Sequence, residues 1–281
     1  MDPADPERTY QDTSPKPELI VALSDDFYAL WGFVPAPLVE ARLSDLEASG
    51  FSANALEILR DRASQSIEHF VRWVLSEDEA LSVPVSALES WARTPRGESG
   101  VVSGLMNQGL VQKLAGAHPG DPGILFSLVM HYVELKRGEA LFVRPGEVHA
   151  YVEGFGLEVM LPSDNVVRAG LTTKHKDSSA FLELANMSSA ELPPLVEPLR
   201  RDNTSTYANF GAPWEVIGVY DQAEVPLEET STVVIVESGP ATLSGQGTQR
   251  TLDRGNVGFW ARESGVLHTT AGSRVWLIRP V

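Results

Sequence analysis

The sequence of 281 residues contains no cysteine. This absence excludes a disulfide framework and a thiolate metal site, so any metal ion must be held by imidazole, carboxylate or amide oxygen. The six histidines are therefore the first residues to consider as metal ligands. They are His69, His118, His131, His149, His175 and His268.

Positive charge is scarce. The chain has 22 Lys and Arg against 38 Asp and Glu, which gives a formal net charge of -16. Sequence-independent binding to nucleic acid or to anionic lipid needs clustered Lys and Arg, so we expect neither partner. A phosphorylated small molecule would bind only at a local group of cations that works against the overall negative field.

Long apolar runs are also missing. A signal peptide begins with basic residues and continues with an apolar stretch, whereas residues 1–8 are acidic and proline-rich. No later segment is apolar for long enough to span a bilayer. We therefore expect a cytoplasmic protein. Its length and 43% hydrophobic content suffice for one large core or for two to three smaller ones.

Two kinds of hydrophobic period follow one another along the chain. From about Leu38 to Ala115, apolar residues recur at steps of three and four, which predicts a small module of several short helices. From Val129 onward, short apolar segments separated by tight turns predict strands, in a number and spacing typical of jelly-roll barrels. The predicted strands include Met130–Leu135, Ala140–Val143, Trp214–Tyr220, Ser231–Val236, Val257–Trp260 and Arg274–Ile278.

His149 lies directly after a predicted strand and a glycine turn, where an imidazole can point into the mouth of a barrel. A lone histidine in such a place is more often a structural residue than a ligand. However, the run that follows is rich in polar and ionisable side chains, and strand alternation puts His149 and Tyr151 on one face. The further members of this run are Glu158, Asp164, Arg168 and Lys174.

The run from His149 to Lys174 closely resembles the signature of the type I phosphomannose isomerases, a metal-dependent family of the cupin superfamily. Ser163-Asp164-Asn165-Val166 and Arg168-Ala169-Gly170-Leu171-Thr172 occur in the order and at the spacing of that family. Lys16-Pro17-Glu18 and His118-Pro119-Gly120-Asp121 are similar to two further family segments. The resemblance covers most of the chain and weakens after about Ser188.

The resemblance implies roles for individual residues. Glu18 and His149 match metal ligands, with one zinc ion as the usual cofactor, while Arg168 and Lys16 match active-site cations. Four others match residues that line the substrate pocket, namely Tyr151, Glu158, Asp164 and Lys174. Structural alternatives exist for these four: an ion pair for Asp164 or Glu158, a solvated charge for Lys174, and barrel core for Tyr151. The other five histidines lack such support, and we expect them to be structural or exposed.

Two features depart from the family. The family's Gln-x-His pair, which supplies two more metal ligands, does not occur here, and Ser14-Pro15 stands where Asn-His is usual. We therefore expect an incomplete metal site and a chain that lacks the N-terminal part of the enzyme, with unpaired strand edges that favour self-association; a complete protein would be a monomer. We expect a remnant of the catalytic cupin domain at residues 1–37 and a helical domain at residues 38–117. The rest of the catalytic domain is expected at residues 118–186, and a C-terminal cupin-like barrel at residues 187–281.

The fold class that follows is mainly β with a helical insertion, built from cupin-type jelly-roll barrels of which the first is incomplete. The function implied by the resemblance is interconversion of mannose 6-phosphate and fructose 6-phosphate through an enediolate, a step toward GDP-mannose, with Lys16, Asp164 and Glu158 left open as the base. The alternative is a non-catalytic cupin module that binds a sugar or phosphosugar, which the missing ligand pair favours.

Overall fold

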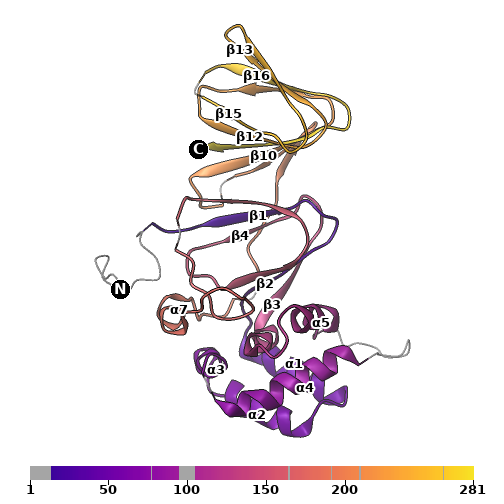
Figure 1. Ribbon diagram of the computed structural model, residues 1–281, viewed down its shortest axis with the longest axis vertical. Coiled ribbons are helices and arrows are strands. Elements are labelled where there is room, and N and C mark those ends of the chain that lie inside the picture. Colours follow the sequence, from indigo (N-terminus) through magenta and orange to yellow (C-terminus); the bar gives the residue numbers. More distant parts are fainter. Residues whose placement is uncertain are drawn as a thin grey trace. The chain divides into compact units, whose positions relative to one another are not determined.

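The computed structural model describes residues 14–76, 78–94, 105–163, 165–190, 192–208, 210–261 and 263–281. The chain divides into two compact units, residues 1–195 and 196–281. The described part is mainly β, with several helices gathered in the first unit (Figure 1). The fold class predicted from the sequence is confirmed, and most of the predicted strands agree with the observed ones to within two residues.

Two antiparallel sheets form the β part of the first unit. One has the order β6-β1-β4-β7, and the other has the order β3-β2-β5. The strands are β1 (Glu18–Ala22), β2 (Phe27–Phe33), β3 (Met130–Leu135), β4 (Ala140–Val143), β5 (His149–Glu153), β6 (Gly156–Met160) and β7 (Leu195–Val196). Side chains such as Ile20, Trp31 and Leu141 fill the space between the sheets, because alternate residues of each strand point to that side.

The tight connection from β5 to β6 depends on Gly154. This residue has a φ of +126°, and a Cβ there would lie 2.6 Å from Cδ2 of Phe27. Only glycine fits both the backbone conformation and the contact. The connection fixes β5 and β6 in different sheets, so that residues close in sequence face each other across the interior.

A helical module covers the outer face of the β3-β2-β5 sheet, at the end of the unit away from β1 and β4 (Figure 1). Alternation in β2 puts Leu30 in the core of the helices and Trp31 between the sheets. A register shift between Trp31 and Phe33 then turns Phe33 to the helical side as well. The helices are α1 (Ala36–Ala48), α2 (Ala53–Ala63), α3 (Ile67–Val74), η1 (Glu79–Leu81), α4 (Ser82–Arg93), α5 (Gln108–Ala117), η2 (Pro122–Leu125) and α6 (Phe126–Val129), and α7 (Ser178–Leu184) follows later in the unit.

The second unit consists of two further antiparallel sheets. Their orders are β15-β12-β17-β10-β9-β8 and β11-β16-β13-β14. The strands are β8 (Leu199–Arg201), β9 (Thr204–Tyr207), β10 (Trp214–Tyr220), β11 (Glu224–Leu227), β12 (Thr232–Ser238), β13 (Ala241–Gly245), β14 (Thr248–Leu252), β15 (Val257–Trp260), β16 (Gly265–Thr269) and β17 (Arg274–Pro280). Val219, Val234 and Leu267 are among the fully buried residues of their shared core. Among the described residues, none of the helices is long and apolar enough to cross a membrane.

Candidate functional site

A cavity of about 1020 Å³ opens in the first unit between the strands and the segment that follows β6. Its walls bring together every described residue that the sequence singled out. These are Lys16, Glu18, His149, Tyr151, Glu158, Arg168 and Lys174. Asp164, the remaining predicted site residue, lies outside the described residues. The cavity volume is at the upper end of the range usual for small-molecule sites.

Strand register explains why these side chains converge. In the first sheet Glu18 pairs with Met160 and Ile20 pairs with Glu158, so Glu18 and Glu158 lie diagonally on one face. In the second sheet His149 pairs with Trp31, whose side chain points to the interior. The two sheets therefore present Glu18 and His149 to each other, and Nε2 of His149 lies 3.3 Å from Oε2 of Glu18.

Glu18 is a buried carboxylate, 7% exposed, with a nitrogen partner at each oxygen. Nζ of Lys16 lies 3.0 Å from Oε1, and the His149 imidazole lies at Oε2. Burial opposes the charged form, but hydrogen bonds and charges from His149 and Lys16 outweigh it and lower the pKa of Glu18 to about 2. Glu18 is therefore ionised in the whole neutral range.

His149 is held in a fixed orientation. Its Nδ1 lies 3.1 Å from the Glu147 carbonyl oxygen, so the hydrogen on Nδ1 is donated to that carbonyl and Nε2 faces Glu18. Burial lowers the pKa of His149, but the hydrogen bonds to Glu18 and to the Glu147 carbonyl outweigh it, and the pKa is raised. Histidines that bind metal ions usually donate their other ring N–H to a carbonyl or carboxylate, as His149 does here.

Glu158 and Tyr151 form the next part of the wall. Loss of hydration and the negative charge of Glu18 raise the pKa of Glu158 above that of an ordinary carboxyl group. The Tyr151 ring lies 5.4 Å from the His149 ring and 5.5 Å from the Phe27 ring. Burial and the charge of Glu158 raise the pKa of the Tyr151 hydroxyl, so it stays protonated and can donate a hydrogen bond.

A catalytic zinc ion generally needs three protein ligands and one open position. Among the described residues, no group of three or more His, Cys, Asp or Glu side chains is arranged to hold a metal ion. Glu18 and His149 supply two suitable donor atoms, yet Lys16 occupies the other oxygen of Glu18. The described residues alone therefore do not fit a zinc ion, and the ligand roles of Glu18 and His149 stay predictions.

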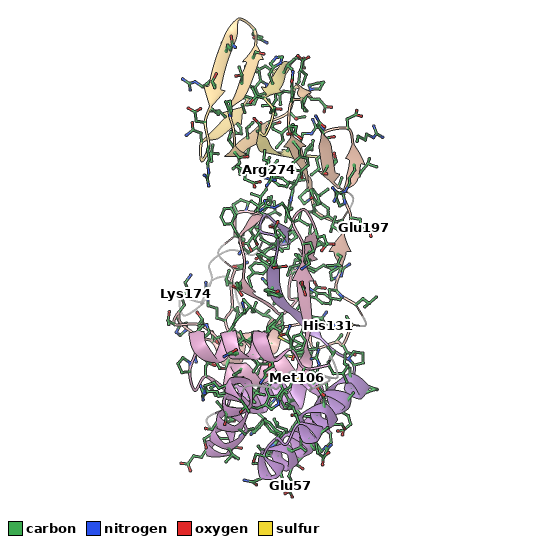
Figure 2. The ribbon with its side chains drawn as sticks, turned by 90° about the vertical axis from the view of Figure 1, so that its right-hand side faces the viewer. Glu57, Met106, His131, Lys174, Glu197 and Arg274 are labelled. Carbon is green, nitrogen blue, oxygen red and sulfur yellow. The ribbon has the colours of Figure 1, made fainter. Side chains whose placement is uncertain are left out.

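Arg168 and Lys174 supply positive charge from the segment after β6. Arg168 is half-buried and Lys174 is exposed, and both line the cavity; Figure 2 shows Lys174 at the edge of the unit. Lys16 is paired with Glu18, so Arg168 and Lys174 supply the local positive charge of this wall in a chain of net charge -16. This local charge provides the attraction for an anionic ligand that the overall field does not.

Sequence reasoning overlooked Glu147 and Arg144, which also line the cavity. The Glu147 carboxylate accepts hydrogen bonds from the Trp31 indole at 3.0 Å and from the Arg144 backbone at 3.0 Å, which fixes the turn that carries His149. Their position in the glycine turn directly before His149 was a usable signal.

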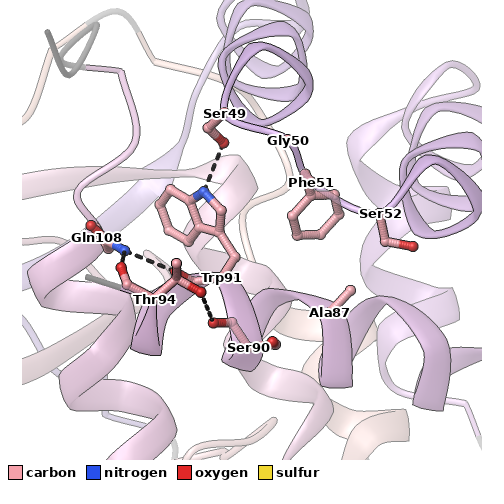
Figure 3. Close-up of a pocket in the computed structure, with 9 residues that line it drawn as sticks. All are labelled: Ser49, Gly50, Phe51, Ser52, Ala87, Ser90, Trp91, Thr94 and Gln108. Atoms are coloured by element: carbon pink, nitrogen blue, oxygen red, sulfur yellow. Dashed lines mark hydrogen bonds between the residues drawn. The ribbon is translucent and has the colours of Figure 1, made fainter. Parts of the chain in front are cut away.

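A second hollow, of about 350 Å³, lies in the helical module between α4 and the turn from α1 to α2 (Figure 3). The Trp91 indole donates to the Ser49 hydroxyl at 2.8 Å, and the Gln108 amide donates to the carbonyls of Trp91 and Thr94. Among the described residues, its lining has no ionisable side chain. These polar contacts are internal to the module, and we assign the hollow a structural role.

No protein-family model matches the chain, but individual proteins do. The probable mannose-6-phosphate isomerase of Dictyostelium discoideum is 31% identical over 260 residues, which are 89% of this chain and 56% of that protein. The corresponding protein of Echinococcus multilocularis is 34% identical over 210 residues, covering 68% of this chain and 47% of that protein. The chain thus spans about half the length of these relatives.

Solved structures agree with the sequence matches. An alanine variant of phosphomannose isomerase from Salmonella typhimurium superposes with a TM-score of 0.79 at 21% identity, over 100% of this chain and 70% of that one. A zinc-bound mannose 6-phosphate isomerase gives a TM-score of 0.78 at 22% identity with the same coverage. These likenesses show the fold, which is of the cupin type. Within that class the chain is a homologue of the mannose-6-phosphate isomerases, which confirms the resemblance found in the sequence.

The lowered pKa of Glu18 predicts a stability change at acid pH. A group whose pKa is lower in the folded state stabilises the protein above its unfolded pKa, here 4.5, and this contribution is lost as the pH falls toward the folded value of about 2. After allowance for solvent screening, we expect about 2 kcal/mol from this effect. Urea unfolding of the first unit in the presence of a chelator, at pH 6, 4.5 and 3, measures it.

The matched variants are Glu18→Gln and Glu57→Gln, the latter at an exposed position of α2. Glu18→Gln should lower stability at pH 6 and flatten the acid dependence, whereas Glu57→Gln should follow the wild type. Equal curves for all three proteins would show that the contacts of Glu18 with Lys16 and His149 contribute nothing to stability.

Proposed function

We propose that this chain forms part of an aldose–ketose isomerase that interconverts mannose 6-phosphate and fructose 6-phosphate. The observation that carries the proposal is the convergence of seven predicted side chains on one cavity of about 1020 Å³. Homology to proteins named mannose-6-phosphate isomerase supports the choice of substrate. We also retain from the sequence a cytoplasmic location and a monomeric complete protein as parts of this proposal.

Isomerisation between an aldose and a ketose moves one proton between two neighbouring carbons, so it needs a group that first accepts and then returns a proton. Glu158 fits this role best among the described candidates, because it lines the cavity beside Glu18 and because burial and the charge of Glu18 make it a stronger base than an ordinary carboxylate by raising its pKa. Lys16 is a weaker candidate, since its ammonium group is paired with Glu18 at 3.0 Å. Asp164 stays a candidate outside the described residues.

The developing oxyanion of the enediolate needs a cation or a hydrogen-bond donor. Arg168 supplies a permanent positive charge in the same cavity, and the protonated Tyr151 hydroxyl supplies a donor. Lys174, at the exposed edge, is suited to attract the phosphate. We infer that zinc is the metal of this enzyme, because a related solved structure is zinc-bound; its remaining ligands would have to come from outside the described residues.

The proposal is tested by following fructose 6-phosphate formation from mannose 6-phosphate in a coupled assay, with and without added zinc, and by measuring zinc content. We expect turnover that Glu158→Gln reduces by about 100-fold or more, the usual contribution of a general base. The same substitution at exposed Glu57 should have no effect. Turnover unaffected by Glu158→Gln would remove Glu158 from the proton-transfer role.

The rival is a module that binds phosphosugar without converting it. The specific observation in its favour is that the described residues offer only two donors to a metal ion, with Lys16 paired to one of them. Calorimetric binding of mannose 6-phosphate without turnover, in the presence of zinc, would support the binding module and contradict the isomerase.

A further inference from the structure

The segment 168–174, which carries Arg168 and Lys174 into the cavity, has no regular secondary structure. Nevertheless its backbone is held in one specific conformation. Leu171 has a φ of +53°, in the left-handed region that residues with a Cβ seldom adopt. A conformation of this kind persists only where surrounding contacts impose it, so the question is which contacts act on Leu171.

The contact comes from Asp121, in the turn between α5 and η2. Its Oδ2 accepts a hydrogen bond from the Leu171 amide at 3.2 Å, while its Oδ1 accepts one from the Gly123 amide at 2.8 Å. One carboxylate thus connects the start of η2 to the strained residue, across 50 residues of sequence. Hydrogen bonds from backbone amides to an ionised acceptor are among the stronger ones in proteins.

Packing makes the connection tight. A Cβ added at Gly123 would lie 2.9 Å from Oδ1 of Asp121 and 3.1 Å from the Leu171 amide nitrogen. A Cβ added at Gly170 would lie 3.2 Å from both Oδ1 of Asp121 and Cα of Gly123. Two glycines therefore allow the backbones to approach closely enough for the carboxylate to reach both amides.

The turn that carries Asp121 is itself anchored. The Gly120 amide donates to Oε1 of Glu89 on α4 at 2.6 Å, and the Asp121 amide donates to the His118 carbonyl at 3.2 Å. On the other side, the Arg168 carbonyl accepts a hydrogen bond from the Asp177 amide at 3.1 Å. The segment is thus fixed at its beginning by Asp177 and in its middle by Asp121, and the second attachment leads into the helical module.

We propose that Asp121 is a positioning residue, which imposes the conformation of segment 168–174 and thereby places Arg168 and Lys174 at the cavity. Asp121 does not line the cavity and touches no reacting group. The functional part of this inference rests on the proposed isomerase activity, whereas the conformational part does not. In this proposal the helical module stabilises one wall of the cavity through Asp121.

Two variants break the connection in different ways. Asp121→Asn leaves a single acceptor oxygen for the two amides of Leu171 and Gly123, so one of them loses its hydrogen bond. Gly123→Ala inserts a methyl group between the two segments without changing any charge. Two controls match them. Lys176→Met removes only the cation 3.7 Å from Oδ2 of Asp121, and Gly116→Ala adds a methyl group on α5, where nothing lies within 4 Å.

The first readout is amide hydrogen exchange of residues 168–174 in the ligand-free protein. We expect the Leu171 amide to exchange about tenfold faster in Asp121→Asn and in Gly123→Ala, as loss of one charge-assisted hydrogen bond predicts. Exchange in β1 and β2 should stay unchanged, and both controls should match the wild type. Wild-type exchange of segment 168–174 in both test variants would overturn the proposal.

The second readout is the isomerase assay. Displacement of a positioned side chain by about 1 Å can lower turnover by about 100-fold, so we expect kcat/KM to fall by tenfold to 100-fold, with a larger change in kcat than in KM. Faster exchange with unchanged kcat and KM would overturn the positioning role. If the wild type shows no turnover, the proposed function fails separately, and the inference is then decided by the exchange data together with calorimetric binding of mannose 6-phosphate to the wild type and both test variants.

Discussion

Replacing Arg168 by alanine should reduce turnover of mannose 6-phosphate by about 100- to 1000-fold, the usual cost of removing one preorganised group that stabilises a developing oxyanion. Arg168 belongs to the signature block and its guanidinium lines the cavity, whereas Lys16 is already paired with Glu18. In a chain of net charge -16, a missing local cation is not replaced by the surrounding field.

The fold should tolerate this substitution. The structural contact of Arg168 uses its backbone carbonyl, which accepts from the Asp177 amide and is unaffected by the side chain. We therefore expect the melting temperature of Arg168→Ala to stay close to that of the wild type. Arg72→Ala is the matched control, because Arg72 is an exposed arginine of α3 that pairs only with Glu68 of the same helix. Equal kcat for Arg168→Ala and the wild type would exclude Arg168 from the reaction.

Arg168→Lys separates charge from shape. Lysine keeps the positive charge but not the planar set of donors, so a partial recovery of turnover would indicate that charge is the main contribution. No recovery would indicate that the fork of guanidinium donors must meet two oxygens at once. Both outcomes are compatible with a role in turnover, and only the unchanged alanine variant is not.

Much of the fold was predictable from local patterns. The ranges Met130–Leu135 and Val257–Trp260 were predicted as strands and are strands, because each short apolar segment ends at a turn that contains glycine or charged residues. The helical module was visible in the three- and four-residue spacing of its leucines. No periodicity marks the division of the chain between the two units, at residues 195 and 196, and the sequence placed the start of the last part at residue 187 from composition instead.

The candidate site was predictable only in part, and for a different reason. Its members were found through a signature, that is, through the order and spacing of residues such as His149 and Arg168. Their pairing was not found: nothing in the sequence says that Lys16 would neutralise Glu18 or that the Glu147 carbonyl would orient His149. These contacts depend on strand register and turn geometry, which a sequence pattern constrains only loosely.

Asp121 and Arg42 illustrate the same difficulty. Asp121 lay in a recognised segment, but its partner Leu171 is 50 residues away and offers only a backbone amide, which every residue has. Arg42 looked like one of the charges between the apolar positions of a helix. The structure places it in the interior, where it is 4% exposed and serves four carbonyl oxygens.

Arg42 joins the helical module to the β part of the first unit. Its Nη1 donates to the carbonyls of Ser127, Leu128 and Met130, at 3.3, 3.0 and 2.7 Å, around the end of α6. Its Nε donates to the Leu105 carbonyl at 3.2 Å, and the guanidinium lies 4.3 Å above the Tyr132 ring. Carbonyls at the end of a helix have no hydrogen-bond donor within the helix. Because these carbonyls are buried away from water, the Arg42 guanidinium donates the hydrogen bonds instead, and its positive charge is favourable at the C-terminal end of the helix.

We therefore expect Arg42→Ala to destabilise the first unit by about 3–5 kcal/mol, since it leaves several buried carbonyls without a donor and opens a cavity beside Tyr132. Arg72→Ala should change stability by less than about 0.5 kcal/mol, as is usual for an exposed ion pair. Arg42→Lys should fall between them, because an ammonium group keeps the charge but loses the geometry that serves both Leu105 and the end of α6.

The measurement is urea unfolding, with the two units followed separately. Trp31, Trp73 and Trp91 report on the first unit and Trp214, Trp260 and Trp276 on the second, so phenylalanine replacement in either set isolates the fluorescence of the other. Arg42→Ala should shift only the transition of the first unit. A loss below about 1 kcal/mol would mean that water replaces the guanidinium at these carbonyls. The junction between helices and sheets would then be held by its apolar contacts rather than by Arg42, and the wall that Asp121 anchors would not depend on that arginine.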